Sequence, residues 1–321
     1  MRFCEYGSEK DEVIYMSKWK ASQMRICEYG SEKEKIMLYQ AGLVLEGGGM
    51  KGIYTAGALE YFLEQDLDFS AIYGVSAGAC HMINFLAKQK GRMFAVSTDY
   101  LKDPHYCGWG SLIKSGDFFN VKMCYTDIPE RLNPYDYETF DKYQGKAYSV
   151  VTNIVTGEPE YLHVKDVRTD IGMVRASASL PLVSRNVEIG DGLYLDGGIS
   201  DAIPLRRSIA DGNKKNLVIM TKEEGYIRQP AGKMTLAMLK AKYKKYPKVV
   251  ELMESRHERY NELVREIEEK KASGEIFLLR PKHPGDVGRI EKDKEKMRVL
   301  YEEGYNDAKE NFDALMKYLE K

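Results

Sequence analysis

Two short glycine-rich segments contain the residues best suited to chemistry. The first reads Gly47-Gly48-Gly49-Met50-Lys51-Gly52, and the second reads Gly74-Val75-Ser76-Ala77-Gly78. Glycines leave the backbone N–H groups of a turn open to a negatively charged atom. In the G-x-S-x-G pattern, a serine on a sharp strand-to-helix turn is presented as a nucleophile. Together the segments indicate attack by Ser76, with the turn at residues 47–52 as an anion site.

The anion that this turn serves could be a nucleotide phosphate or a reaction oxyanion. Residues 47–52 fit the G-x-G-x-x-G fingerprint of dinucleotide-binding proteins, which also needs an acidic residue about 20 positions on, after the next strand. Here that strand ends at Ser76, and Asp68 precedes it. A phosphate loop of the Gly-Lys-Ser/Thr kind is also absent. The pattern favours an oxyanion held by Gly48 and Gly49, with nucleotide binding as the alternative.

A serine hydroxyl becomes a strong nucleophile only when a base removes its proton. Of the five histidines, His81 follows Ser76 on the same expected helix and should point elsewhere. Only His257 and His283 follow in the Ser…Asp…His order of α/β-hydrolases, and neither has the local features of a catalytic histidine. Asp196, in Leu195-Asp196-Gly197-Gly198, is the better candidate, because a carboxylate in a water-poor site can act as a base.

Alternating elements must position these residues. Apolar runs predict strands at 41–46 and 69–75, each followed by a helical pattern, at 53–65 and 77–88. Further strands are expected at 147–155 and 158–164, which form a hairpin, and at 193–195 and 216–220. Short strands alternating with helices predict an α/β fold with a mostly parallel sheet covered on both faces. In such sheets, sites gather beyond the C-terminal strand ends, where both glycine segments lie.

Three regions flank or interrupt this pattern. Residues 97–145 are rich in aromatic side chains and are expected to form a loop-rich insertion that contacts substrate. Residues 221–321 predict a mainly helical region packed on the core, with charged helices at 243–271 and 293–321 and an added strand at 275–279. Both helices carry charges of mixed sign, unlike a membrane-surface helix.

The N-terminal residues contain a repeat, since residues 1–10 recur with one substitution at 24–33. Two copies are too few for a solenoid, so residues 1–40 are interpreted as a duplicated extension. The expected organisation is therefore this extension, a catalytic domain at 41–220 and the C-terminal region at 221–321.

Composition excludes several function classes. The 321 residues contain 48 Lys and Arg against 49 Asp and Glu, so the formal charge of −1 gives no case for nucleic acid. Five cysteines without C-x-x-C spacing predict a reducing compartment and no metal site. No signal peptide and no apolar run of membrane-spanning length is visible, which predicts a cytoplasmic protein.

The motifs, in this order, resemble the patatin-like phospholipase family, in its bacterial, cytosolic-type branch. Ala176-Ser177-Ala178-Ser179-Leu180-Pro181 is similar to a further family segment that precedes the aspartate. The resemblance implies a three-layer, modified α/β-hydrolase-like fold and a Ser76–Asp196 dyad that needs no histidine, metal or cofactor. It also implies oxyanion donors at Gly48 and Gly49, and supporting positions at Gly47, Lys51, Gly52, Gly74, Gly78, Gly197 and Gly198. One departure is Ser200-Asp201-Ala202-Ile203-Pro204, where many members carry an Asn-x-Pro run.

The expected activity is therefore that of a serine acyl hydrolase. It would cleave a phospholipid, lysophospholipid or related acyl ester through an acyl-enzyme intermediate. A lipid substrate also implies transient peripheral contact with a membrane. The alternatives are a nucleotide-binding protein that uses the turn at residues 47–52, and a non-catalytic scaffold with the same fold.

Overall fold

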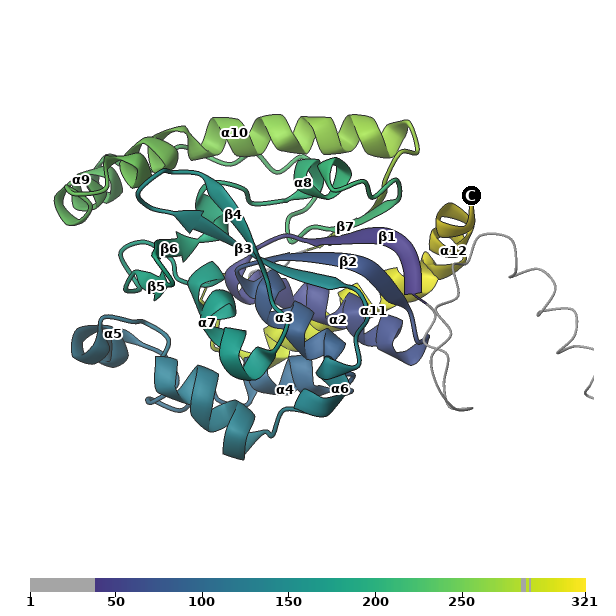
Figure 1. The fold of residues 1–321 in the computed structure, drawn as a ribbon, viewed down its shortest axis with the longest axis horizontal. Helices are drawn as coiled ribbons and strands as arrows, with labels where there is room; N and C mark the ends of the chain where they lie inside the picture. The colour runs from purple at the N-terminus through teal and green to yellow at the C-terminus, as the bar shows by residue number, and fades with distance from the viewer. Residues whose placement is uncertain (1–37, 284–286, 289) are drawn as a thin grey trace, which may run out of the picture.

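A central sheet of eight strands organises the part of the chain that the structure describes. The computed structural model describes residues 38–283, 287–288 and 290–321, so the repeat within residues 1–33 lies outside it. The strand order is β5-β6-β3-β2-β1-β7-β8, with β4 also paired to β3 (Figure 1). The strands are β1 Leu38–Leu45, β2 Asp68–Val75, β3 Lys146–Asn153, β4 Pro159–His163, β5 Val187–Ile189, β6 Gly192–Asp196, β7 Asn216–Ile219 and β8 Phe277–Leu279.

Most of the strand pairs that lead from β3 to β8 are those expected of an α/β fold. β1 runs parallel to β2 and β7, β2 runs parallel to β3, and β7 runs parallel to β8. β4, β5 and β6 enter through antiparallel pairs, so the sheet is mixed. The expected hairpin is confirmed by the β3–β4 pair, and the expected late strand is confirmed by β8.

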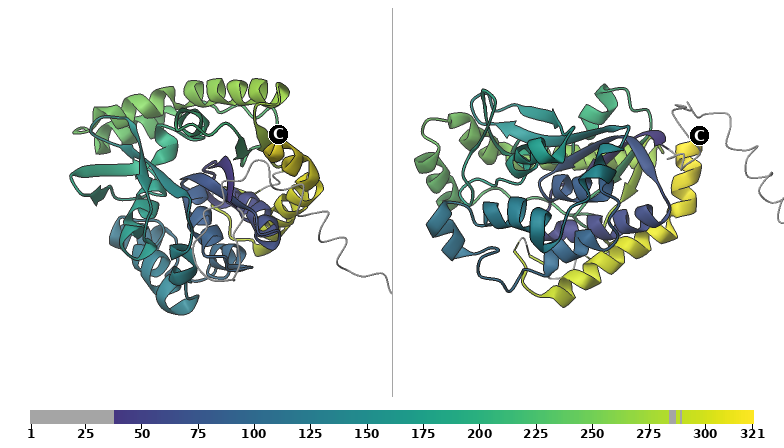
Figure 2. Two further views of the ribbon diagram at one scale, coloured as in Figure 1. Left: turned by 45° about the vertical axis from the view of Figure 1, so that its right-hand side comes forward. Right: turned by 60° about the horizontal axis from the view of Figure 1, so that its bottom comes forward.

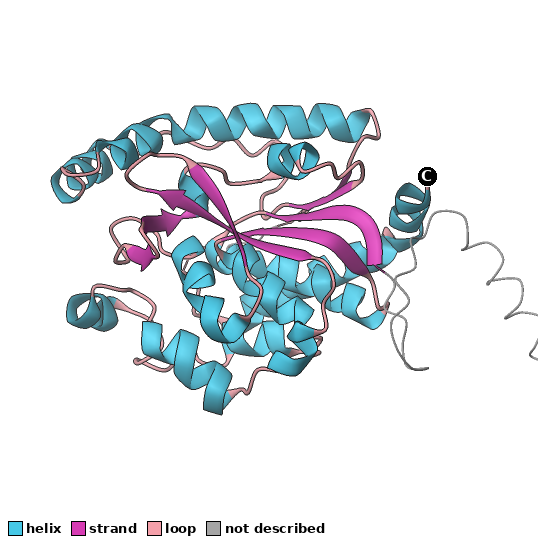
Figure 3. Ribbon diagram, in the orientation of Figure 1, coloured by secondary structure: helices cyan, strands magenta, loops and turns pink. Residues whose placement is uncertain are grey.

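Helices cover both faces of the sheet, which gives three layers (Figures 1 and 3). On β1, Leu43 and Leu45 face one core and Val44 faces the other. This alternation follows from the period of two along a strand, and it buries apolar side chains on both sides. The helices are α2 Ile53–Glu64, α3 Ala77–Leu86, α4 Arg92–Thr98, α5 Trp109–Ser115, α6 Tyr137–Asp141, α7 Val167–Ser177, α8 Leu205–Ala210, α9 Lys233–Lys242, α10 Pro247–Ala272, α11 Lys294–Glu310 and α12 Phe312–Glu320, with short turns η1 Gly49–Gly52 and η3 Gly197–Ile199.

The α2 and α11 helices pack backbone against backbone. A Cβ atom added at Gly57 would lie 1.9 Å from the carbonyl oxygen of Tyr301, and one added at Gly304 would lie 2.0 Å from that of Tyr54. Only glycine permits such an approach. The Tyr54 hydroxyl donates a hydrogen bond of 2.9 Å to Asp307, which also holds α11 against α2.

Two expectations about helices need correction. The helix expected at 293–321 is divided at Asn311, whose side chain donates to the Asp307 carbonyl oxygen. The insertion at residues 97–145 is more ordered than expected, with α5, α6 and the π-helical segment η2 Met123–Leu132. These elements are too short, or, with Pro129 inside η2, too irregular to give a clear period in the sequence.

Within the described ranges, no helix combines the length and the apolar character that crossing a bilayer requires.

Candidate active site

Ser76 lies on a sharp turn between β2 and α3. Its backbone has φ 54° and ψ −120°, a conformation that side-chain-bearing residues rarely adopt and that costs roughly 1–3 kcal/mol. Cβ atoms added at Gly74 and Gly78 would each lie 2.6 Å from backbone atoms of Ala79 and Leu45. The G-x-S-x-G pattern is thus explained by the space around the turn, as in a nucleophile elbow.

The glycine turn at residues 47–52 lies directly against Ser76. A Cβ atom added at Gly47 would lie 2.9 Å from the Ser76 Cβ, and one added at Gly48 would lie 2.5 Å from Thr221 Oγ1. Gly49 has φ +58°, in the left-handed region. The N–H groups of Gly48 and Gly49 donate no hydrogen bond to a residue that the structure describes. Both peptide groups line the same cavity as Ser76.

Asp196 ends β6 on the other side of β3. The pairing register sets Val75, which precedes Ser76, against Val150, and sets Asp196 against the next residue, Val151. The two candidate residues therefore flank β3 at the same level of the sheet. Asp196 is buried, and its Oδ1 accepts a hydrogen bond of 2.8 Å from the Gly198 N–H.

The end of α7 links Ser76 to Asp196. The Ser177 hydroxyl donates to the Val150 carbonyl oxygen at 2.6 Å and accepts from the Ser76 N–H at 2.8 Å. Two residues later, the Ser179 carbonyl oxygen accepts a hydrogen bond of 2.8 Å from the Asp196 N–H. The segment at residues 176–181, identified in the sequence by resemblance alone, thus holds both candidate residues through hydrogen bonds.

The charge of Asp196 reaches the first turn of α3. Burial, with a contribution from the Asp196 carboxylate, raises the pKa of the Cys80 thiol to about 12. Cys80 lies one helical turn after Ser76, and its N–H donates to the Ser76 carbonyl oxygen. The negative charge of the aspartate therefore acts within the neighbourhood of the serine turn.

A cavity of about 560 Å³ joins these parts. Ser76, Asp196, Gly198 and the turn at residues 47–49 line it together. Much of the remaining wall is apolar and comes from the aromatic insertion, with Tyr106, Phe118, Phe119, Val121, Ile128 and Tyr135. Such a cavity has the volume and the mostly apolar wall of a small-molecule site.

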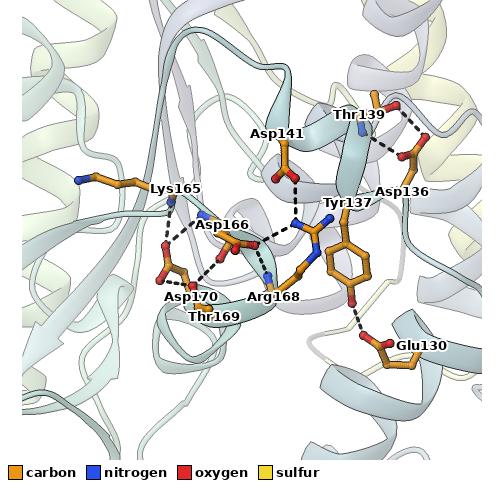
Figure 4. Close-up of polar contacts among 10 residues, drawn as sticks. All are labelled: Glu130, Asp136, Tyr137, Thr139, Asp141, Lys165, Asp166, Arg168, Thr169 and Asp170. Carbon is orange, nitrogen blue, oxygen red and sulfur yellow. Dashed lines mark hydrogen bonds and ion pairs between the residues drawn. The ribbon is translucent and has the colours of Figure 1, made fainter.

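Polar contacts hold the insertion against α7 at one side of the cavity (Figure 4). The Arg168 guanidinium donates to Asp141 at 2.8 Å and lies 4.8 Å from the centroid of the Tyr137 ring. The Tyr137 hydroxyl donates to Glu130 of η2. Glu130, Tyr137 and Arg168 all line the cavity, so this network ties η2, α6 and α7 into one wall.

Helix α10 holds the two loops that carry the candidate residues. Glu46 directly precedes the glycine turn, is fully buried, and accepts a hydrogen bond of 2.7 Å from the Tyr260 hydroxyl. Arg256 donates to the Gly198 carbonyl oxygen at 2.6 Å. Arg259 donates to the carbonyl oxygens of residues 199 and 200 at 2.8 and 2.7 Å. These roles were not predicted, since Arg256 and Arg259 lie in a charged segment typical of a solvated helix face.

The histidines take different positions from those of a catalytic triad. His81, five residues after Ser76, lines the same cavity. Burial lowers the pKa of His81 to about 4, so its imidazole is neutral at neutral pH. The His257 Nε2 atom lies 3.8 Å from Oε1 of Glu258, and the His283 Nδ1 atom lies 4.0 Å from Oε1 of Glu303. The His283 side chain is 90 % exposed. Neither is among the described residues that line the cavity.

Two further sites were considered from the sequence. Lys51 is half-buried and is not among the described residues that line the cavity. In the described part of the chain, no group of three or more His, Cys, Asp or Glu side chains could hold a metal ion.

Comparisons with known proteins bear on this arrangement. A family model described as Patatin-like phospholipase matches residues 43–209, and a domain of unknown function, DUF6363, matches residues 246–320. The uncharacterized protein YjjU of Escherichia coli is 32 % identical over 187 residues, which cover 56 % of this chain and 51 % of YjjU. The probable lipid hydrolase 463L of Invertebrate iridescent virus 6 is 23 % identical over 192 residues, covering 56 % of this chain and 66 % of that protein.

The chain therefore spans about half to two thirds of the curated relatives that it matches. Among solved structures, VipD from Legionella pneumophila matches with 15 % identity and a TM-score of 0.43, covering 96 % of this chain and 73 % of VipD.

Proposed function

The chain belongs to the patatin-like phospholipase family, and we propose that it is a serine acyl hydrolase that cleaves acyl esters of lipids. One observation carries the proposal. Ser76, Asp196 and the glycine turn at residues 47–49, far apart in the sequence, line one cavity with a largely apolar wall. That combination supplies a nucleophile, a base, anion-binding amides and room for an acyl chain.

In the first half of the proposed reaction, Asp196 takes the proton of the Ser76 hydroxyl as its oxygen attacks the ester carbonyl carbon. The carbonyl oxygen becomes negatively charged and accepts hydrogen bonds from the N–H groups of Gly48 and Gly49. Removal of one such donor typically costs about 3–4 kcal/mol of barrier. The intermediate then expels the alcohol, which receives the proton from Asp196, and an acyl group remains on Ser76.

In the second half, Asp196 takes a proton from water, and the resulting hydroxide attacks the acyl carbon. The Ser76 oxygen leaves and regains a proton from Asp196, and a fatty acid is released. The buried position of Asp196 in the wall of the same cavity supports its role as the group that carries the proton in both halves. The neutral His81 is not needed for proton transfer in this scheme.

The cavity supports a lipid ester as the substrate. Its aromatic and aliphatic wall suits a hydrocarbon chain, and Ser76 and Asp196 line the same cavity, where a reacting ester would meet them. Phospholipids, lysophospholipids and shorter acyl esters all share this chemistry, and a substrate of this kind would bring the protein into transient contact with a membrane.

Hydrolysis by variants of the full chain tests the proposal. Wild type should release fatty acid from at least one member of a panel of phospholipids, lysophospholipids and short-chain esters, in the presence of EDTA. Ser76→Ala and Asp196→Asn should each lower kcat by several powers of ten. His257→Ala and His283→Ala, the matched controls, should keep nearly full activity.

Thermal unfolding of each variant shows whether the fold is intact. Loss of all activity in EDTA would contradict the metal-free mechanism, and a histidine variant as inactive as Asp196→Asn would contradict the dyad.

A further inference from the structure

The segment that contains α9 has an unusual charge. Residues 225–250 contain no Asp or Glu, and their cations are Arg228, Lys233, Lys240, Lys242, Lys244, Lys245 and Lys248. The mixed charge expected of the helix at 243–271 therefore begins only after residue 250. A strongly basic helix next to apolar residues is the pattern typical of a protein that lies on a membrane surface.

The α9 helix has one side toward the cavity and another toward solvent. Thr235 and Leu239 line the cavity, and Leu239 is buried. Met234 and Met238 lie outside, with 78 % and 52 % of their surface exposed. The helix therefore borders the proposed substrate site while presenting apolar side chains outward.

A second exposed apolar group lies on α5. Trp109 and Ile113 are 70 % and 86 % exposed, and Lys114 is beside them. The Trp109 ring packs edge-on against Phe118, which lines the cavity, with 6.1 Å between ring centroids. Residues 104–116 contain no Asp or Glu. Like α9, this helix thus borders the cavity wall with apolar and basic residues outside.

The two helices lie at the same end of the molecule, as Figure 1 and the right-hand view of Figure 2 show. One loop contacts both. The Val183 carbonyl oxygen accepts a hydrogen bond of 2.8 Å from the Phe118 N–H, just after α5. The next carbonyl oxygen, of Ser184, accepts one of 3.1 Å from Lys242, the last residue of α9. The loop at residues 183–184 therefore links the two helices at this end of the molecule.

Several of the cations at this end are uncompensated. Lys240 pairs with Glu254, and Lys248 pairs with Glu251. Lys233, Lys244 and Lys245 are exposed and form no ion pair with a carboxylate that the structure describes. Their charge complements a negatively charged surface.

We propose that this end of the molecule docks on an anionic lipid bilayer through a docking face made of Trp109, Ile113, Lys114, Lys233, Met234, Met238, Lys244 and Lys245. The apolar side chains enter the interfacial region, where tryptophan is favoured, and the lysines approach the lipid phosphates. Docking places the cavity between α5 and α9 against the membrane. The inference rests on the proposed function in one respect, namely that docking brings lipid substrate to the cavity. Binding to the bilayer itself requires no catalysis.

Vesicle binding by the full-length Ser76→Ala protein tests the docking face without hydrolysis of the vesicles. Trp19→Phe is added so that Trp109 is the remaining tryptophan. Vesicles of phosphatidylcholine with 30 % phosphatidylglycerol should shift the Trp109 emission to the blue and co-sediment the protein. Vesicles of phosphatidylcholine alone should bind at least tenfold more weakly, and added salt should weaken binding to the anionic vesicles.

Two variants locate the face. Lys233→Glu/Lys244→Glu/Lys245→Glu and Met234→Ser/Met238→Ser should each weaken co-sedimentation at least tenfold, with an unchanged thermal midpoint. Lys309→Glu/Lys317→Glu, which alters exposed lysines of α11 and α12, is the matched control and should bind like its parent. Equal binding by the docking-face and control variants would overturn the proposal, as would a failure to bind anionic vesicles. A protein would then be the alternative partner of this face.

The same docking variants with Ser76 restored separate this proposal from the enzymatic one. They should hydrolyse a water-soluble short-chain ester at the wild-type rate and lose hydrolysis of vesicle lipids. Vesicle binding by a protein that hydrolyses no ester would overturn the proposed function alone. Full vesicle hydrolysis by the docking variants would overturn the docking proposal alone.

Discussion

At the scale of single residues, the conformation of Ser76 is the feature that most needs support from its surroundings. A positive φ at a serine is unfavourable, so contacts elsewhere must hold the turn. The Ser177 hydroxyl meets that need, because it bonds to the Ser76 N–H and to the Val150 carbonyl oxygen in the buried core. One side chain thus fixes the serine turn to the strand that separates it from Asp196.

Ser177→Ala should therefore affect both stability and turnover. Loss of the hydroxyl leaves two buried backbone groups without their partner and should lower the free energy of unfolding by about 1–3 kcal/mol. Displacement of the turn should lower kcat on a short-chain ester about tenfold and leave KM nearly unchanged. Urea unfolding and steady-state kinetics measure the two effects.

Ser208→Ala is the control for Ser177→Ala, since Ser208 is also fully buried and hydrogen-bonded, to Asn216. It should lose stability and keep kcat. If Ser177→Ala retains wild-type kcat, its hydroxyl does not hold the turn in a reactive position.

Some residues of the candidate site could be predicted from local sequence motifs, and others could not. Ser76 and Asp196 lie beside glycines that are required because neighbouring atoms leave no room for a side chain. These short glycine patterns can be recognised in the sequence. Glu46 contacts Tyr260 across 214 positions, and no local pattern contains that pair. His81 lines the cavity as well, because the wall of the cavity extends along α3 beyond the residues next to Ser76.

At the scale of elements, α10 connects the C-terminal region to the site. Arg256 and Arg259 bond to the loop after Asp196, and Tyr260 bonds to the residue before the glycine turn. The three side chains lie within two helical turns, so one element holds both loops. Movement of α10 would therefore displace Asp196 and the glycine turn at residues 47–52 together.

Arg259→Met tests this positioning role. The variant keeps an apolar stem and loses the hydrogen bonds to residues 199 and 200, so kcat on a short-chain ester should fall about tenfold with little change in KM. Arg259→Lys should restore part of the activity, because lysine can still donate to one carbonyl oxygen.

Arg265→Met, on an exposed part of the same helix, is the control and should behave as wild type. Equal kinetics for Arg259→Met and Arg265→Met would show that α10 does not position the site.

The regular elements were largely predictable, and the short ones were not. Helix α2 and strand β2 fall within one residue of their expected bounds, because long apolar periods define them. The α5 and η2 elements were expected as loops, since seven residues give too little periodicity and a π-helix lacks the 3.6-residue period. The α9 helix was also missed, because its apolar residues lie on several sides and give no clear period.

At the scale of the whole molecule, one sheet carries the candidate site from several directions. β1 and β2 lead into the glycine turn and Ser76, and β6 enters from the opposite direction and ends at Asp196. β6 runs antiparallel to β3 and ends opposite Val151, so its final residue, Asp196, lies level with the start of α3. Global strand order of this kind was predicted only as mostly parallel, because long-range pairing leaves no local signal.

The C-terminal region extends this sheet and covers it. β8 pairs with β7, α10 packs on one face, and α11 contacts α2 on the other. Together with the docking face on α5 and α9, this organisation places the cavity between a rigid core and one basic, apolar end of the molecule.

The central claim, that Ser76 forms a covalent acyl intermediate with Asp196 as its base, is tested most directly by trapping the serine. Full-length protein is treated with a fluorophosphonate, and the adduct is located by intact-mass measurement and peptide mapping. One adduct on Ser76 is expected, with none on Ser76→Ala and labelling at least a hundredfold slower for Asp196→Asn. An adduct on another residue, no adduct on folded wild type, or unchanged labelling of Asp196→Asn would contradict the account.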